Sequence, residues 1–221
     1  MRIGLFGGTF NPVHTGHLRA ALEVKEVFGL DEMHLIPSAV PPHKDARGVA
    51  DARHRLEMVR LAAGDADGFV VSEVELQRRG PSYSVDTAGF YRKSMAADNE
   101  LFLVIGGDAF MDIHTWKSYR RLFSMVPFIV MVRPQAGAPE STPAFQSIGR
   151  CLRQQVDSNY TWQPRQQRFI HTTLQTVAIT EVTRLQISAT RIRELIAAGR
   201  SIRYLVPDAV MAYIQQKGLY R

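Results

Sequence analysis

Short apolar runs alternate with amphipathic stretches along most of this chain, and that alternation restricts its fold more than any other feature. The runs expected to form strands are residues 2–6, 33–37, 69–74, 101–105 and 127–132, with a sixth within residues 174–179. Because parallel strands require long crossover connections, which are usually helices, this order predicts an α/β protein. We expect a doubly wound, mostly parallel sheet with helices on both faces.

The chain of 221 residues is expected to form a single domain, residues 1–221, with two departures from this rhythm. Residues 134–168 are rich in Pro, Gln, Ser and Arg and are interpreted as an irregular insertion or elaborated crossover, within which residues 145–156 could form a helix. Residues 188–221 are expected to form a C-terminal helical portion, because two helical patterns there are each followed by a glycine.

The apolar runs and the cysteine content of the sequence indicate the cellular compartment of the protein. No uninterrupted apolar run approaches the roughly 18 residues of a membrane span, so a membrane is not an expected partner. Glycines, Asn11 and Pro12 interrupt the N-terminal segment too early for the apolar centre of a signal peptide. The single cysteine, Cys151, cannot form an internal disulfide. A reducing compartment fits best, which predicts a cytoplasmic protein.

The positive charge of the chain is concentrated in its C-terminal third. Residues 150–221 carry 11 Lys and Arg against 4 Asp and Glu, whereas residues 1–149 carry 16 against 17, which together give the net charge of +6. Such a region can attract nucleic acid, draw a small polyphosphate into a cleft, or form an ordinary solvated surface. The charge alone does not decide among the three.

Two glycines directly follow the first expected strand, in the stretch GGTFNPVHTGH at residues 7–17. Glycine lets the backbone turn sharply and leaves no Cβ to block a ligand, while the next helix offers N–H groups at its N-terminus. A phosphate group would fit there. Glycine also serves tight turns for conformational reasons alone, so the turn by itself leaves both interpretations open.

The same stretch contains two histidines, His14 and His17, whose spacing of three places their rings on one side of a helical turn. Gly16 leaves space between them. Two imidazoles there could donate hydrogen bonds to phosphate oxygens and stabilise charge in a transition state. A zinc site is the alternative, but the other histidines and Cys151 show no metal-ligand spacing.

The segment ISATRIR, residues 187–193, places two hydroxyl side chains and two arginines at the start of an expected helix. Ser188 or Thr190 could serve as an ordinary helix N-cap. A cap needs only one hydroxyl, however. The second hydroxyl, the helix N–H groups and an arginine guanidinium together suit the outer phosphates of a triphosphate.

These two motifs resemble the paired signatures of the nucleotidyltransferase superfamily, and the chain is more closely similar to the bacterial nicotinate-mononucleotide adenylyltransferase family. The resemblance extends over nearly the whole chain and is weakest at 134–168. Further matching blocks are VPPHK (40–44), PSYS (81–84), IGGD (105–108), HTW (114–116) and the tail from Val206. The resemblance implies a Rossmann-like nucleotidyltransferase fold and transfer of the adenylyl group of ATP to nicotinate mononucleotide, with release of pyrophosphate. It implies Mg²⁺, held mainly by ATP phosphates and water with no metal ligands from the protein, and no nucleic-acid partner.

The resemblance also implies roles for particular residues. The catalytic set is His14, His17 and Arg193. The set expected to bind ATP and its phosphates is Gly8, Thr9, Phe10, Lys44, Gly106, Asp108, Ser188 and Thr190. The set expected to bind nicotinate mononucleotide is Tyr83, Ser84, Thr87 and Trp116, with Trp116 stacked on the pyridine ring.

Several of these residues have ordinary structural alternatives. Trp116 could be a core residue, Lys44 a solvated loop charge and Asp108 a helix cap. Asn11 stands where some relatives carry aspartate and is given no acid–base role, and Lys117 stands where some carry an aromatic. For the whole protein, the alternatives are another small-molecule nucleotidyltransferase, such as one that adenylylates phosphopantetheine, or an RNA-binding module.

Overall fold

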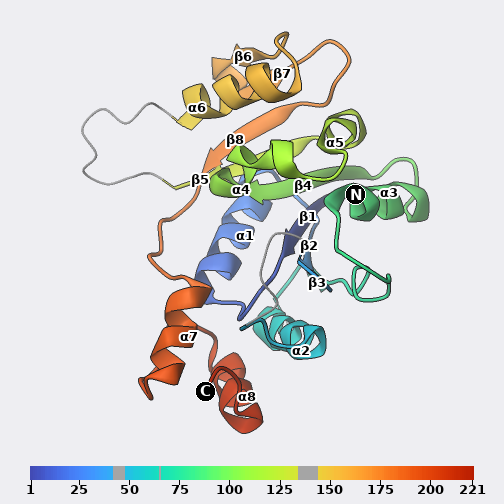
Figure 1. Cartoon of the computed structure of the whole chain (residues 1–221). Helices are drawn as coiled ribbons and strands as arrows, with labels where there is room; N and C mark the ends of the chain where they lie inside the picture. Colours follow the sequence, from blue (N-terminus) through green and yellow to red (C-terminus); the bar gives the residue numbers. More distant parts are fainter. Residues whose placement is uncertain (42–47, 65, 134–143) are drawn as a thin grey trace, which may run out of the picture.

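The computed structural model describes residues 1–41, 48–64, 66–133 and 144–221, and its centre is one eight-stranded sheet (Figure 1). The strands are β1 (Arg2–Gly8), β2 (Glu32–Pro37), β3 (Phe69–Val71), β4 (Glu100–Gly106), β5 (Phe128–Val132), β6 (Thr161–Gln163), β7 (Arg168–Ile170) and β8 (Val177–Glu181). Their order in the sheet is β3-β2-β1-β4-β5-β8-β7-β6. The first six of these are parallel, whereas β7 and β6 run antiparallel to their neighbours.

Helices cover both faces of the sheet, which confirms the doubly wound α/β prediction. The α-helices are α1 (Thr15–Val27), α2 (Ala52–Ala63), α3 (Ser84–Ser94), α4 (Gly107–Met111), α5 (Tyr119–Met125), α6 (Ala144–Cys151), α7 (Ala189–Ala197) and α8 (Asp208–Lys217). Short single-turn segments are η1 (Ile113–Thr115), the π-helical η2 (Leu152–Val156) and η3 (Pro164–Gln166). Figure 1 shows α2, α7 and α8 gathered at one end of the molecule and α6, β6 and β7 at the other.

Alternating side chains of the central strands supply two separate hydrophobic cores. In β1, Ile3 and Leu5 point into the core that contains α3 to α6, whereas Phe6 joins the core formed with α1, α2, α7 and α8. In β5, Phe128 and Ile129 divide in the same way. Because both faces are covered, these strands consist of continuous apolar runs, which is why the sequence identified them.

Helix boundaries follow the local signals. The carboxylate of Asp51 accepts a hydrogen bond from the backbone N–H of Arg53 at 2.8 Å and so caps α2. Gly199 and Gly218 follow α7 and α8 with φ angles of 66° and 61°, a region in which glycine has no Cβ penalty. The two expected C-terminal helices are therefore present.

The structure confirms the helix expected at residues 145–156 and shows that the rest of the described stretch is more ordered than the interpretation as irregular implied. Within the described part, residues 144–168, the chain forms α6, η2, β6 and η3 and enters β7. These strands extend the sheet beyond β8 by antiparallel pairing. Two strand boundaries also differ: β3 ends at Val71 instead of residue 74, and the sixth expected strand, β8, begins only at Val177.

In the part of the chain that the structure describes, no helix is long and apolar enough to cross a membrane.

Candidate active site

The order of the strands reverses between β1 and β4, because β2 and β3 lie on one side of this pair and β5 and β8 on the other. In open α/β sheets, ligands bind beyond the carboxyl ends of the strands at such a switch point. A cavity of about 590 Å³ lies there. Its wall includes Phe6, Gly7, Gly8 and Thr9 from the end of β1 and Leu103, Val104, Ile105 and Gly106 from the end of β4. Both expected glycine turns therefore reach one cavity.

The glycine turn after β1 is closed by an aromatic side chain. Phe10 has a φ of 48° and is only 2% exposed. Its ring lies against Gly8, where an added Cβ would come within 2.9 Å of the ring. The ring also makes an edge contact with His17, with centroids 5.1 Å apart. The Phe10 ring thus packs directly against the turn. A side chain at position 8 would collide with this ring, which explains the glycine there.

His14 and His17 form a stacked pair at the start of α1. Their ring centroids are 3.7 Å apart with an interplanar angle of 22°. The backbone N–H of His14 donates to Nδ1 of His17 at 3.3 Å, so a neutral His17 carries its proton on Nε2. A Cβ on Gly16 would lie 3.2 Å from Nδ1 of His14. The glycine between the histidines therefore makes room for the stack.

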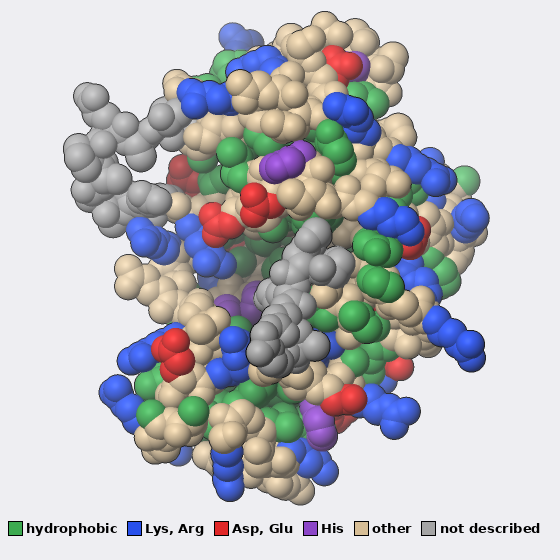
Figure 2. Space-filling model, in the orientation of Figure 1, with side chains coloured by type: hydrophobic (Ala, Val, Ile, Leu, Met, Phe, Trp, Pro, Cys, Tyr) green, Lys and Arg blue, Asp and Glu red, His purple; other side chains and the backbone are tan. Residues whose placement is uncertain are grey.

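His14 is held neutral at physiological pH. It is 4% exposed, and burial together with the nearby charge of Arg133 lowers its pKa to about 4. Arg133 directly follows β5, so a third strand also directs a charged side chain toward this end of the sheet. Figure 2 shows histidine side chains inside a hollow of the surface with Lys and Arg side chains around it. Arg133 thus brings positive charge to this end of the sheet, beside an imidazole that is uncharged.

The arginine of the second motif reaches the glycine-rich loop from α7. Arg193 donates from Nη1 to the carbonyl of Asn11 at 2.8 Å and from Nη2 to the hydroxyl of Thr190 at 3.3 Å. Ser188 is the N-cap of α7, and its hydroxyl accepts from the N–H of Arg191 at 3.2 Å. Asn11 and Arg193 are 182 residues apart in the sequence, so their hydrogen bond shows that the two motifs lie side by side in the structure.

Asn11 joins three segments around this loop. Its side-chain amide donates to the carbonyl of Gly48 at 2.8 Å, and its Oδ1 accepts from the N–H of Ala50 at 3.0 Å. The same Oδ1 accepts from the hydroxyl of Tyr220 at 2.8 Å. Burial raises the pKa of Tyr220, so its hydroxyl remains a donor. Asn11 thus has a structural role that an acid–base interpretation would have overlooked.

A buried arginine supports the same loop from below. Arg55 in α2 is 1% exposed and donates to the carbonyls of Ala50, Thr9 and Ala39 at 2.9, 2.8 and 3.0 Å. These carbonyls belong to loops that follow β1 and β2 and precede α2. Sequence reasoning missed Arg55, since a charged residue in an amphipathic helix is normally exposed.

The other side of the cavity contains most of the residues expected to bind the pyridine nucleotide. Tyr83, Ser84 and Trp116 line it, and Trp116 also packs partly against the hydrophobic core. Both interpretations of Trp116 are therefore compatible with its position. Lys117 lines the same wall.

Two expected residues, Thr87 and Asp108, are placed away from the residues that line the cavity, and a third cannot be compared. The hydroxyl of Thr87 donates to Glu75 at 2.6 Å and accepts from Arg78 at 2.6 Å, so it is buried behind the wall and not part of it. Asp108 is exposed in the first turn of α4, beyond the residues that line the cavity. Lys44 lies outside the described residues.

Among the described residues, no group of three or more His, Cys, Asp or Glu side chains is arranged to hold a metal ion.

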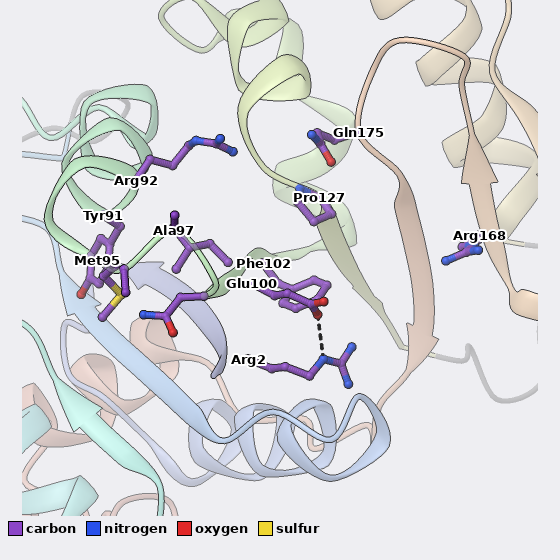
Figure 3. Close-up of a pocket in the computed structure, with 13 residues that line it drawn as sticks. Arg2, Tyr91, Arg92, Met95, Ala97, Glu100, Phe102, Pro127, Arg168 and Gln175 are labelled. Atoms are coloured by element: carbon purple, nitrogen blue, oxygen red, sulfur yellow. Dashed lines mark hydrogen bonds and ion pairs between the residues drawn. The ribbon is translucent and has the colours of Figure 1, made fainter.

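A second cavity of about 590 Å³ lies at the opposite, amino ends of the same strands (Figure 3). It is bordered by Arg2 from β1, Phe102 from β4 and Pro127 before β5. Arg92 and Arg168 add positive charge from α3 and β7. Neither motif of the sequence reaches this cavity.

A glycine turn, stacked histidines and a helix start with arginine, all at the switch point of a parallel sheet, define a nucleotide-binding protein that handles phosphates. The family model described as cytidylyltransferase-like matches residues 5–195. The chain therefore belongs to this family. Similar full-length sequences bear a name that specifies an activity within it.

Two relatives are each named "Probable nicotinate-nucleotide adenylyltransferase". The one from Desulfatibacillum aliphaticivorans is 42% identical over 222 residues, covering 100% of both chains. The one from Pseudomonas fluorescens is 43% identical over 225 residues, covering 100% of this chain and 97% of the relative. The solved structure of Plasmodium falciparum nicotinic acid mononucleotide adenylyltransferase superposes with a TM-score of 0.71 at 14% identity, covering 99% of this chain and 97% of that one. The family and the Rossmann-like nucleotidyltransferase fold expected from the motifs are thereby confirmed.

Proposed function

We propose that this protein transfers the adenylyl group of ATP to the 5′-phosphate of nicotinate mononucleotide, giving nicotinate adenine dinucleotide and pyrophosphate. The observation that carries the proposal is the cavity at the switch point, with the glycine turn on one wall and Trp116 and Tyr83 on the other. Full-length relatives at 42–43% identity bear the name of this activity, and the Plasmodium falciparum protein was solved in complex with the dinucleotide product.

Phosphate oxygens are the groups that the first motif would hold. The N–H groups at the turn of Gly8 and Thr9 face the nucleotide, and His14 and His17 donate to the phosphates. The second motif, at the start of α7, would hold the leaving pyrophosphate through Ser188, Thr190 and Arg193. Because the guanidinium of Arg193 already bonds to the loop that precedes the histidines, both sets are fixed relative to each other before substrate arrives.

The reaction needs alignment more than proton transfer. An oxygen of the acceptor phosphate, which is ionised at neutral pH, attacks the α-phosphorus of ATP. The bond from that phosphorus to the bridging oxygen of the β-phosphate breaks, and pyrophosphate leaves with the electron pair. No general base is required, so the neutral state of His14 is no obstacle to its role as a hydrogen-bond donor.

Mg²⁺ is the proposed cofactor, and it would supply charge neutralisation on the phosphates of ATP. This ion keeps several waters and binds through few protein carboxylates, which fits a cavity whose described surroundings contain no carboxylate cage. Lys44 and Asp108 remain candidates for the outer phosphates and a ribose hydroxyl, respectively.

Pyrophosphate release by the purified protein with ATP and Mg²⁺ tests the proposal, with nicotinate mononucleotide, nicotinamide mononucleotide and phosphopantetheine as competing acceptors. We expect fastest turnover with the first. Turnover only with phosphopantetheine would keep the phosphate site but assign a different acceptor. No turnover together with salt-sensitive RNA binding would favour the nucleic-acid alternative.

A further inference from the structure

The substrate cavity contains a single positively charged side chain among the described residues that line it, namely Lys117. It follows Trp116, which is proposed to stack on the pyridine ring. Two acidic side chains, Glu75 and Asp112, also line the cavity. The position of this cation beside Trp116 is relevant to acceptor choice, because the pyridine ring of the acceptor can carry either a charged carboxylate or a neutral carboxamide.

The ammonium group of Lys117 is held at the wall of the cavity by two weak contacts. Its Nζ lies 4.3 Å from the centroid of the Tyr83 ring, a cation–π contact. It also lies 3.5 Å from Oδ2 of Asp86, with both side chains about half exposed. An exposed ion pair at this distance stabilises little, so a better-placed carboxylate could take the ammonium from Asp86.

The start of α3 supplies a second positive feature at the same place. Tyr83 is the N-cap of α3 and Ser84 its first residue, and both line the cavity. The first N–H groups of a helix have no partner within the helix, and that end carries a partial positive charge. The Lys117 ammonium over the Tyr83 ring and these N–H groups therefore border the same corner of the cavity.

Glu75, one of the two acidic residues that line the cavity, already has partners of its own. The carboxylate of Glu75 accepts from the Thr87 hydroxyl at 2.6 Å and lies 3.7 Å from the Arg78 guanidinium. A ligand that enters the corner near Tyr83 consequently meets the Lys117 ammonium, whose ion-pair partner is the half-exposed carboxylate of Asp86.

We propose that Lys117 determines acceptor specificity, by favouring a pyridine nucleotide whose ring carries a carboxylate over one whose ring carries a carboxamide. This proposal rests on the proposed function and adds to it the residue that discriminates between the two acceptors. A carboxylate gains a charge-assisted hydrogen bond from the ammonium, whereas a carboxamide gains only a weaker bond to its oxygen.

The test is the ratio of kcat/KM for nicotinate mononucleotide to kcat/KM for nicotinamide mononucleotide. We expect Lys117→Gln to lower this ratio about five- to tenfold, mainly through a higher KM for the nicotinate form. Lys117→Arg should restore most of the ratio, because it keeps the charge. Lys93→Gln, which removes an exposed lysine near the far end of α3, is the matched control and should leave the ratio unchanged.

A loss caused only by disturbed packing on Tyr83 would lower both kcat/KM values equally and would not be rescued by added charge, and that result would overturn the role of Lys117. An unchanged ratio in Lys117→Gln would overturn it as well. Absence of turnover by the wild-type protein with either acceptor would instead overturn the proposed function itself, so the two failures are distinguishable.

Discussion

The two cavities have equal volumes of about 590 Å³ and lie at opposite ends of β1 and β4, but they are lined by different kinds of residue. The helix α3 borders both. Its first residue, Ser84, lines the cavity at the carboxyl ends of the strands, and Arg92, near its last turn, lines the cavity at the amino ends. One helix thus offers N–H groups to one cavity and carbonyl groups to the other.

Two arginines of the amino-end cavity, Arg2 and Arg92, donate to carbonyl groups at the C-terminal ends of other helices. Arg2 donates to the carbonyl of Phe28, which caps the end of α1, and pairs with Glu100 at 3.0 Å (Figure 3). Arg92 donates to the carbonyl of Met125 at the end of α5. Positive side chains stabilise helix C-termini in this way. The comparison teaches that cavity size and positive charge do not mark a phosphate site; strand direction and helix polarity do.

The largest effect that would sharpen this comparison is expected from His17→Ala. Loss of one preorganised hydrogen-bond donor should lower kcat about 10²- to 10³-fold, measured as pyrophosphate release. The circular dichroism spectrum should stay unchanged, because the His17 side chain is only partly buried. Near-normal kcat in the folded variant would remove His17 from the phosphate site.

The second effect concerns stability toward acid. Burial and Arg133 hold the pKa of His14 at about 4 in the folded state, against 6.5 for the free side chain. The unfolded chain therefore binds more protons between pH 6.5 and pH 4, so the free energy of unfolding should fall by roughly 3 kcal/mol as pH drops through this window. Urea titrations of wild type and His14→Asn would measure it, with the exposed His114→Asn as control. A pH slope that His14→Asn leaves unchanged would contradict the buried neutral state.

Trp116→Ala should have a smaller effect, confined to one substrate. Loss of ring stacking should raise KM for nicotinate mononucleotide about tenfold and KM for ATP by much less. Trp162→Ala is the matched control, since Trp162 in β6 stacks on Phe145 far from the glycine turns. Equal increases in both KM values for Trp116→Ala would assign Trp116 to the core instead.

The smallest effect is expected at the amino-end cavity. Arg92→Gln should change kcat and both KM values by less than about twofold, because Arg92 stabilises a helix end and not a substrate. Steady-state kinetics beside a thermal melt would separate the two roles. A severalfold loss of activity without loss of stability would show that the amino-end cavity influences the reaction, and would contradict its purely structural role.

The parallel strands and both motifs could be read from the sequence because each rests on local physical chemistry. Buried strands are apolar runs, and glycines at their ends mark turns that need a backbone without Cβ. The three-residue strands β6 and β7 were missed because TWQ and RFI are too short to display any alternation. Their pairing depends on β8, which is distant from β6 in sequence.

Arg55 and Asn11 show a second limit of sequence reasoning. Nothing local distinguishes Arg55 from the other arginines of α2, because its burial depends on loop carbonyls at Thr9, Ala39 and Ala50 that only the folded chain brings together. Arg133 was missed for the same reason. Its importance comes from its distance to His14 and not from any motif.

The hydrogen bond from Tyr220 to Asn11 links residues 209 positions apart. As the chain emerges from the ribosome, Asn11 can bond to Gly48 and Ala50 early, but its Oδ1 lacks the hydrogen bond from Tyr220 until residue 220 has been synthesised. Arg193 of α7, which donates to the carbonyl of Asn11, is also synthesised late. The loop that contains Asn11 therefore receives its last contacts near the end of biosynthesis, so nascent fragments that already contain the histidines lack the hydrogen bonds from Arg193 and Tyr220.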